Sequence, residues 1–237
     1  MLYDVTDVAR AGARKLTQLD FVTNNLANAS TNGFKAEHLY FAMKGKPAQE
    51  EALSSLGNTV SHMNFSQGTL RVTGNSLDLA IEGDGFFTIQ TRQGDAYTRN
   101  GSFALNKNKE LVTLNGEYVL GQAGKIVIDG KDVSIDKDGT ISVDGNPSGK
   151  LKIVDFGNAQ ALTRSGEGRF LDSGKAELKE AGSYRIAGGY LEMSNVNAVR
   201  EMTDMIEIQR AFETYQKVIL TLQTMDNIAT NRIGKVG

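Results

Sequence analysis

The side chains that most often do chemistry in proteins are scarce in this sequence. It contains no cysteine, which excludes disulfides, thiol nucleophiles and cysteine-ligated zinc. Only two histidines occur, His38 and His62, and no G-x-S-x-G motif presents a serine that either could activate. We interpret both histidines as solvated loop residues and expect no catalytic triad.

Two glycine-rich segments match nucleotide-binding loops only in part. Gly83-Asp84-Gly85 begins like a dinucleotide fingerprint, but Thr88 stands where the third glycine belongs. The segment also joins two predicted strands, so it lacks the helix N-terminus that would hold phosphate. Ser165-Gly166-Glu167-Gly168 is not followed by the lysine of a phosphate loop. We interpret both segments as tight turns.

Acidic residues form one group that starts like a calcium loop. In an EF-hand numbered from Asp136, the twelfth residue would be a bidentate glutamate, but here it is Pro147. Two of three further carboxylates could be imagined as the catalytic pair of a glycosidase: Asp172, Glu177 and Glu180. They lie in a polar segment, and nothing in the sequence places them in a cleft. We therefore expect no metal, no cofactor and no catalytic residue, and we predict that the chain is not an enzyme.

Composition excludes several classes of partner. The 237 residues are 40% hydrophobic and carry a net charge of −2, with both signs mixed along the chain, which is not the basic footprint of a nucleic-acid-binding protein. No run of about 18 apolar residues occurs, so we expect no membrane insertion. The N-terminal sequence lacks the basic start and apolar block of a cleaved secretion signal.

Both ends of the chain have helical periodicity. From Tyr190 to Ile233 there is neither glycine nor proline, apolar residues recur every three or four positions, and Asn197 can serve as an N-cap. Residues 3–30 repeat the pattern with a narrower stripe of small residues, which suits close helix–helix contact. The pair Asn32-Gly33 provides a stop signal, and Phe34 could fold back against that helix. We expect the two helices to form a coiled-coil pair.

The middle of the chain has the pattern of an antiparallel sheet. Of the 26 glycines, 19 lie between Gly74 and Gly189, and several follow Asn or Asp as two-residue hairpins prefer. Short alternating segments between these turns predict a sandwich or a partly closed barrel. The fold class is therefore α+β, with an antiparallel β-rich domain inserted between terminal helices. We expect an assembly helix over 1–35, a linker over 36–66 with a short helix near 48–56, the β domain over 67–188 and a second assembly helix over 189–237.

Three stretches together resemble the flagellar axial protein family, the rod and hook subunits of bacteria. The first runs from Asn24 to Lys35. The second runs from Gln67 to Gly101 and includes the segment Ala80-Ile81-Glu82-Gly83-Asp84-Gly85-Phe86-Phe87. The third runs from Gly189 to Glu213. Together they span nearly the whole chain.

The resemblance implies a structural subunit of the flagellar basal-body rod. A short chain with one β domain favours a rod subunit over a hook subunit, and the short connection after the first helix favours the proximal-rod type over the distal-rod type. Family members are exported unfolded through the flagellum's own export apparatus without a cleaved signal, so the expected location is the periplasmic rod. The implied partners are copies of this chain and other rod proteins in a helical assembly. Contact with peptidoglycan stays open.

The proposed mechanism is assembly through apolar and small residues that the helix pair leaves uncovered. The predicted assembly interface consists of Val5, Val8, Leu16, Leu19, Val22, Leu26, Asn28, Phe34, Val199, Met202, Met205, Ile208, Phe212, Tyr215, Ile219 and Leu222. Two hypotheses from other classes compete with it. One is a secreted glycan-binding protein or adhesin that uses the β domain, and the other is a cell-wall hydrolase, which no convergent carboxylate pair supports.

Overall fold

A computed structural model describes residues 5–41, 59–130 and 132–233. The short helix expected near 48–56 lies outside these residues. By their contacts the described residues form two compact units. A helical unit comprises residues 5–27, 37–41, 59–62 and 197–233, and a β unit comprises residues 28–36, 63–130 and 132–196.

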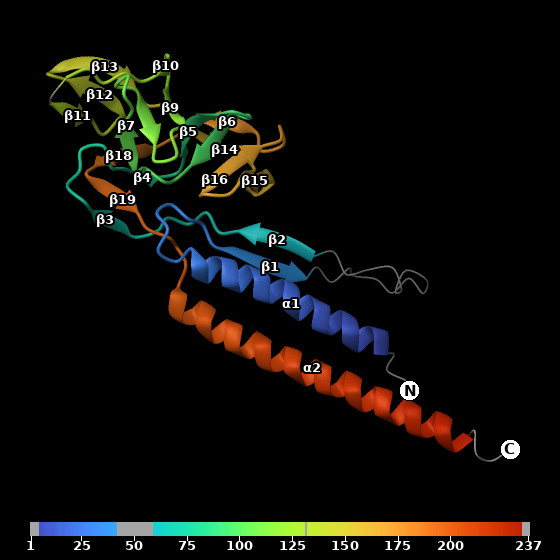
Figure 1. The fold of residues 1–237 in the computed structure, drawn as a ribbon. Helices are drawn as coiled ribbons and strands as arrows, with labels where there is room; N and C mark the ends of the chain where they lie inside the picture. The colour runs from blue at the N-terminus through green and yellow to red at the C-terminus, as the bar shows by residue number, and fades with distance from the viewer. Residues whose placement is uncertain (1–4, 42–58, 131, 234–237) are drawn as a thin grey trace. The chain divides into compact units, whose positions relative to one another are not determined.

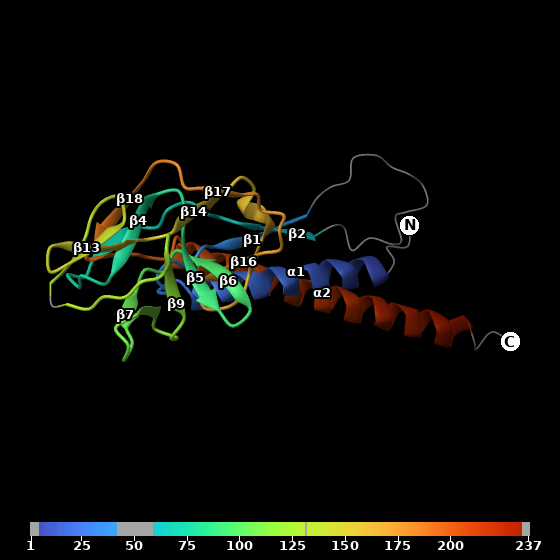
Figure 2. The same ribbon diagram turned by 90° about the horizontal axis from the view of Figure 1, so that it is seen from above.

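The helical unit is built on two helices that run antiparallel in contact with each other, α1 (Val5–Ala27) and α2 (Ala198–Ile233) (Figures 1 and 2). The predicted cap of α2 is confirmed, because the Oδ1 atom of Asn197 accepts a hydrogen bond from the backbone N–H of Arg200 at 3.2 Å. Beside α1 lies a two-stranded sheet of β1 (Glu37–Phe41) and β2 (Thr59–Met63). We predicted neither strand, since their segment carries no clear alternation.

The β unit contains an inserted antiparallel sheet system, as predicted. Its largest sheet has the order β15-β16-β6-β5-β9-β8-β7, and β10, β14 and β17 pair beside that path. The strands of this sheet are β5 (Phe86–Thr91), β6 (Gly94–Thr98), β7 (Phe103–Leu105), β8 (Leu111–Thr113), β9 (Tyr118–Gly121), β10 (Gly124–Lys125), β14 (Ile153–Phe156), β15 (Leu162–Arg164), β16 (Arg169–Asp172) and β17 (Leu178–Glu180). A single 3-10 turn, η1 (Ala159–Ala161), precedes β15.

Three smaller sheets complete the unit. The remaining strands are β3 (Leu70–Val72), β4 (Leu79–Gly83), β11 (Val133–Ile135), β12 (Thr140–Val143), β13 (Asn146–Lys150), β18 (Tyr184–Gly188) and β19 (Tyr190–Glu192). They pair as β11-β12-β13, β18-β4 and β19-β3, all antiparallel. Tyr190–Glu192, which falls within the helix predicted over 189–237, therefore forms strand β19, and the helix begins only at Ala198.

The Asp144-Gly145 and Asn100-Gly101 pairs both predict two-residue turns, which is confirmed at the first pair and wrong at the second. Asp144 and Gly145 have φ angles of 50° and 81° and link β12 to β13, as a two-residue turn requires. Gly101 instead passes so close to Leu79 that a Cβ atom would lie 1.7 Å from the Leu79 carbonyl oxygen. The glycine at 101 therefore allows two backbone segments to approach each other.

Two groups of buried side chains form the core of the β unit. The larger one gathers aliphatic residues and the edge-to-face pair Phe87–Phe103, whose ring centroids are 5.1 Å apart. The second is aromatic, with Phe86 in edge-to-face contact with Phe156 and Phe170 at 5.6 and 5.7 Å. These cores hold the strands whose turns and ends carry the features described next.

Candidate functional site

A buried ionic cluster fastens the segment that follows α1 to the β unit. The Nζ atom of Lys35 lies 2.6 Å from Oε1 of Glu192, and an Arg99 guanidinium nitrogen lies 3.4 Å from Oε2 of the same carboxylate. All three side chains are buried. The Glu192 carboxylate also accepts a hydrogen bond from the Gly68 backbone N–H at 2.9 Å, and Lys35 donates to the carbonyl of Ser66 at 2.7 Å. We call Lys35, Arg99 and Glu192 the ionic cluster.

Burial and charge act in opposite directions on the two cations of this cluster. Removal from water lowers the pKa of Lys35, and the nearby Glu192 carboxylate opposes that shift. Burial likewise lowers the pKa of Arg99, again opposed chiefly by Glu192. The single carboxylate of Glu192 receives charge-assisted hydrogen bonds from both cations, although the buried Nε atom of Arg99 has no partner in the described residues.

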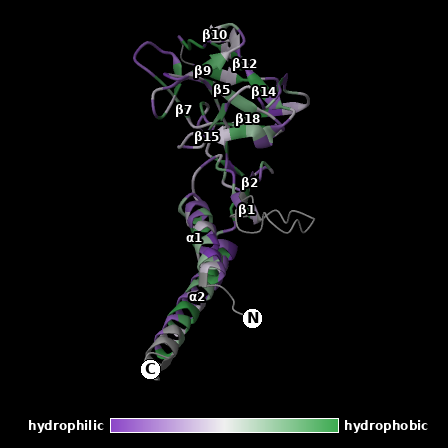
Figure 3. Ribbon diagram, turned by 90° about the vertical axis from the view of Figure 1, so that its right-hand side faces the viewer, coloured by the Kyte–Doolittle hydropathy of each residue, from purple (hydrophilic) through white to green (hydrophobic). Residues whose placement is uncertain are grey.

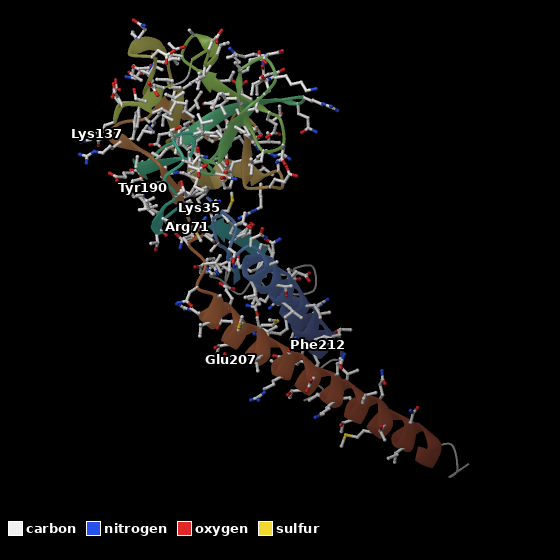
Figure 4. All side chains as sticks on the ribbon, turned by 60° about the vertical axis from the view of Figure 1, so that its left-hand side comes forward. Lys35, Arg71, Lys137, Tyr190, Glu207 and Phe212 are labelled. Carbon is white, nitrogen blue, oxygen red and sulfur yellow. The ribbon has the colours of Figure 1, made fainter. Side chains whose placement is uncertain are left out.

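The backbone of the same segment is held as tightly as its side chains. The Gly33 N–H donates to the Glu192 carbonyl at 2.7 Å, and the Ala36 N–H donates to Oδ1 of Asn195 at 2.7 Å. Gly33 has a φ of +68°, and a Cβ atom there would lie 2.3 Å from the backbone nitrogen of Asn100. Residues 33–36 therefore behave as an integral part of the β unit, although they follow α1 in sequence (Figure 4 labels Lys35).

The face of α2 that packs on α1 carries most of the apolar residues in the predicted stripe. Gly12 of α1 lies beside Phe212 and Tyr215, since a Cβ atom at Gly12 would be 3.8 Å from Tyr215 and 3.9 Å from Phe212. Figure 4 labels Phe212 on α2. The small residue in α1 thus makes room for an aromatic pair on α2. Ile208 is only 9% exposed. The other members of this face are half-buried: Met205, Phe212, Tyr215, Ile219 and Leu222.

Near the start of α2 the helix pair buries a carboxylate. Glu201 is 3% exposed, and its Oε2 atom has no hydrogen-bond partner in the described part of the chain. Burial raises the pKa of this carboxyl, and Asp204 adds to the rise, while a hydrogen bond from Asn25 and the charges of His38 and Arg200 oppose it. A buried carboxylate oxygen without a partner costs the helix pair stability when it is charged.

Exposed apolar residues of α2 lie in two groups, one towards each end of the helix, and the exposed positions between the groups are polar. Val199, at 75% exposed, is followed by Met202 and Ile206 at helical spacing. Towards the other end of α2, Leu220 and Met225 are 62% and 61% exposed. We call the exposed apolar residues of α2 the outer face: Val199, Met202, Ile206, Val218, Leu220, Met225 and Ile228.

Part of the outer face lies where α2 extends past its partner. α2 has 36 residues and α1 has 23. The antiparallel register set by Gly12 places Val5 opposite about residue 221 of α2, counting residues one for one along two straight helices. Met225 and Ile228 therefore lie beyond the described part of α1. Figure 3 shows hydrophobic colouring along this end of α2.

The residues of the predicted interface occupy three different environments. Phe34 is buried in the β unit, where the Arg164 guanidinium lies 4.2 Å from its ring centroid, and Asn28 belongs to the same unit. Leu16, Val199 and Met202 are exposed. The remaining α1 positions whose side chains are described are half-buried: Val8, Leu19, Val22 and Leu26. Val5 begins α1, and its side chain is outside the described set.

Sequence reasoning missed the ionic cluster and part of the outer face. Ile206, Val218, Leu220 and Ile228 fall between the positions of the single stripe that we predicted. Lys35, Arg99 and Glu192 each follow an apolar or aromatic residue by one or two positions within the three recognisable stretches. Residues of opposite charge next to apolar or aromatic residues were the sequence signal that could have indicated a buried ion pair.

The histidines and acidic residues that were candidates for chemistry lie in strands and turns of the fold. His38 and His62 are in strands β1 and β2 rather than in loops, and the His62 ring lies edge-on to Tyr40 with centroids 6.0 Å apart. Within the residues described, no three His, Asp or Glu side chains gather as a metal site would require. A hydrogen bond from Lys150 lowers the pKa of Asp138 to about 2, in the turn between β11 and β12.

The polar sequence of residues 176–183 predicts a loop, which is wrong, because the segment contains β17. All three residues of β17 are exposed at the edge of the large sheet, so no buried face imposes an alternating pattern on the sequence.

None of the helices in the described part of the chain is long and apolar enough to cross a membrane.

Comparisons with known proteins agree with this architecture. Residues 9–35 match the model of the flagella basal body rod protein family, residues 80–143 match the flagellar hook protein FlgE/F/G D1 domain, and residues 187–232 match the flagellar basal body rod FlgEFG protein C-terminal family. The chain is similar to the flagellar basal-body rod protein FlgF of Caulobacter vibrioides, with 36% identity covering 92% of this chain and 93% of the relative. It is also similar to FlgG of Bacillus subtilis, with 35% identity over 86% and 89% of the two chains. FlgF of Escherichia coli is 34% identical over 88% of this chain and 89% of the relative. The similar identities to FlgF and FlgG do not resolve one type from the other.

Proposed function

We propose, from the premise that the chain belongs to the flagellar basal-body rod protein family, that the outer face of α2 is the surface through which copies assemble. The chain is a structural subunit of the flagellar basal-body rod and not an enzyme. Large exposed apolar residues on one helix are the observation that carries the proposal. A solvent-exposed apolar face of this kind is typical of a protein interaction surface.

The geometry of the helix pair favours open-ended assembly. In the helical unit α1 covers one face of α2 and leaves the outer face to other contacts. A contact between this face and a different surface of a second copy is heterologous, and heterologous contacts that do not close generate a helical filament. The half-buried residues that face α1 would then set the spacing of the pair, while the outer face supplies the intermolecular contact.

The finer assignments follow from the family and are part of the same proposal. The subunit is placed in the periplasmic rod with copies of itself and other rod proteins as neighbours, and it reaches that place through the flagellar export apparatus. The short connection between α1 and the β strands supports the proximal-rod FlgF type over the distal-rod FlgG type. Purified basal bodies probed for the position of this subunit along the rod would decide between the two.

The test is a charge placed on the outer face. Met225→Asp would put a carboxylate on an exposed apolar position beyond the described part of α1, so the helix pair should keep its stability while assembly is lost. The variants are expressed in a motile bacterium whose own copy of the gene is deleted. Swimming in soft agar and the subunit content of isolated basal bodies are measured.

Gln223→Asp is the matched control, because it adds the same charge to the same turn of α2 at an exposed polar position. We expect normal incorporation of the control and at least a tenfold loss for Met225→Asp. Equal incorporation of both variants would contradict the proposal.

A further inference from the structure

The β unit carries a cleft of about 660 Å³ that the assembly proposal does not use. It lies where the turns of three hairpins meet the large sheet: β5–β6, β8–β9 and β15–β16. Small-molecule sites in proteins commonly have volumes of roughly 300–1,000 Å³. The polar lining that the argument uses consists of Gln90, Gln93, Asn115, Tyr118, Ser165 and Arg169.

The charges at the cleft compensate one another. Arg169 is hydrogen-bonded to Glu117, and its guanidinium also lies 3.2 Å from a Glu167 oxygen. The Nδ2 atom of Asn115 donates to Glu167 at 2.7 Å. Arg92 also lines the cleft, and Lys125, whose ammonium group lies against the Tyr118 ring, is 3.9 Å from a Glu110 oxygen. Three cations therefore meet three carboxylates in this region, which leaves no excess of positive charge for a phosphate group.

The rest of the lining offers planar amides, hydroxyl groups and one aromatic ring. Ala96 and Leu171 add small apolar patches to the lining. The Lys125 ammonium group lies over one face of the Tyr118 ring, 3.4 Å from the ring centroid. Amide and hydroxyl groups can both donate and accept hydrogen bonds, which matches the paired hydroxyl groups of a sugar.

We propose that this cleft binds a neutral oligosaccharide. Amides of Gln90, Gln93 and Asn115 would bond the sugar hydroxyls, and the Arg169–Glu117 pair would hold one wall in place. A nucleotide is a poorer fit because the guanidinium is already occupied by two carboxylates. A wholly apolar ligand would leave the amides without partners, which costs binding energy.

The inference stands apart from assembly, because its residues are in the β unit and the outer face is on α2. The test therefore uses the full-length monomer in solution. It is titrated with N-acetylglucosamine tetrasaccharide and, separately, with maltotetraose, and amide chemical shifts are followed by NMR. We expect saturable shifts at the three hairpin turns with at least one of these neutral glycans.

Two variants locate the binding. Asn115→Ala and Gln93→Ala each remove hydrogen bonds at the cleft, and each should raise Kd about 5-fold or more, which corresponds to one lost hydrogen bond of about 1 kcal/mol. Gln122→Ala removes an exposed amide that does not line the cleft and should leave Kd unchanged. Thermal melting of each variant checks that it folds.

Two results would overturn the inference. The first is the absence of saturable shifts with both glycans. The second is binding that Asn115→Ala and Gln93→Ala leave unchanged although both variants melt like the parent, since the sugar would then occupy another place.

Discussion

At the residue scale, the ionic cluster differs in kind from the surface ion pairs of this protein. Lys35 and Glu192 are fully buried, whereas Lys109 and Asp129 form an ion pair with 57% and 72% of their side chains exposed. Buried charges that lose a partner leave an uncompensated charge away from water, while exposed pairs contribute little to stability. The two kinds of pair can therefore be compared within one chain.

We expect Lys35→Met to lower the free energy of unfolding by about 3–5 kcal/mol, because Glu192 would lose its closest cation and keep only Arg99 at 3.4 Å. Lys109→Met is the control and should cost less than about 1 kcal/mol. Urea denaturation followed by circular dichroism measures both. Similar losses in the two variants would mean that the cluster is no stronger than a surface pair.

Glu201 gives a second prediction at this scale, in the dependence of stability on pH. Its pKa is raised by burial in the folded chain, so the cost of its charge is absent below the ordinary glutamate pKa of about 4.3 and appears as pH rises through the raised value. Glu201→Gln should therefore raise the melting temperature of the helices at pH 7 more than at pH 4. Ellipticity at 222 nm reports the helices.

Glu213→Gln, at an exposed position of α2, serves as the control. It should change the melting temperature by the same small amount at both pH values. A Glu201→Gln variant that is less stable than the parent at pH 7 would show that the buried carboxylate is stabilising.

At the element scale, the segment 28–36 joins α1 to the β unit by entering the β unit itself. Its conformation depends on Gly33, whose positive φ brings the backbone against Arg99 and Asn100. Two penalties would act together on any side chain at this position. One is the left-handed conformation, and the other is the collision with the neighbouring backbone.

Gly33→Ala separates these penalties when it is compared with Gly166→Ala. Gly166 has a similar φ of +64°, but a Cβ atom there meets nothing within 4 Å. The control, Gly166→Ala, should lower the free energy of unfolding by about 1–2 kcal/mol, from the left-handed conformation alone. Gly33→Ala should cost on the order of 4 kcal/mol or more, or prevent folding. Urea denaturation measures both, and equal costs would show that the close approach relaxes without penalty.

Sequence patterns predicted the elements that are periodic or carry a local signal. The two helices, the Asn197 cap and the Asp144-Gly145 hairpin are examples, because helical periodicity and backbone conformation are written in neighbouring residues. Strands β1, β2 and β17 were missed, since short strands at exposed edges need no alternating pattern. The sequence also suggested one apolar stripe on α2, whereas the structure covers part of its apolar residues and exposes the rest in two groups. Only the position of α1 determines which residues it covers.

At the scale of the whole molecule, the two units differ in how completely they bury their apolar residues. The β unit has two cores of its own and holds the glycine-rich hairpins, whereas the helical unit exposes large apolar side chains along α2. A long helix with an uncovered apolar face gains stability when that face is packed. The failure to assemble that we expect for Met225→Asp is a property of the whole molecule, since Met225 is 61% exposed and lies beyond the described part of α1.

The separation in sequence between Lys35 and Glu192 has a consequence for biosynthesis. The two residues are 157 positions apart, so a growing polypeptide cannot close the ionic cluster until residue 192 has left the ribosome. At translation rates of about 5–20 residues per second, that takes roughly 10–40 s from the first residue. During this period the N-terminal segment lacks its docking site. A receptor for unfolded chains therefore has tens of seconds to bind it before native folding competes.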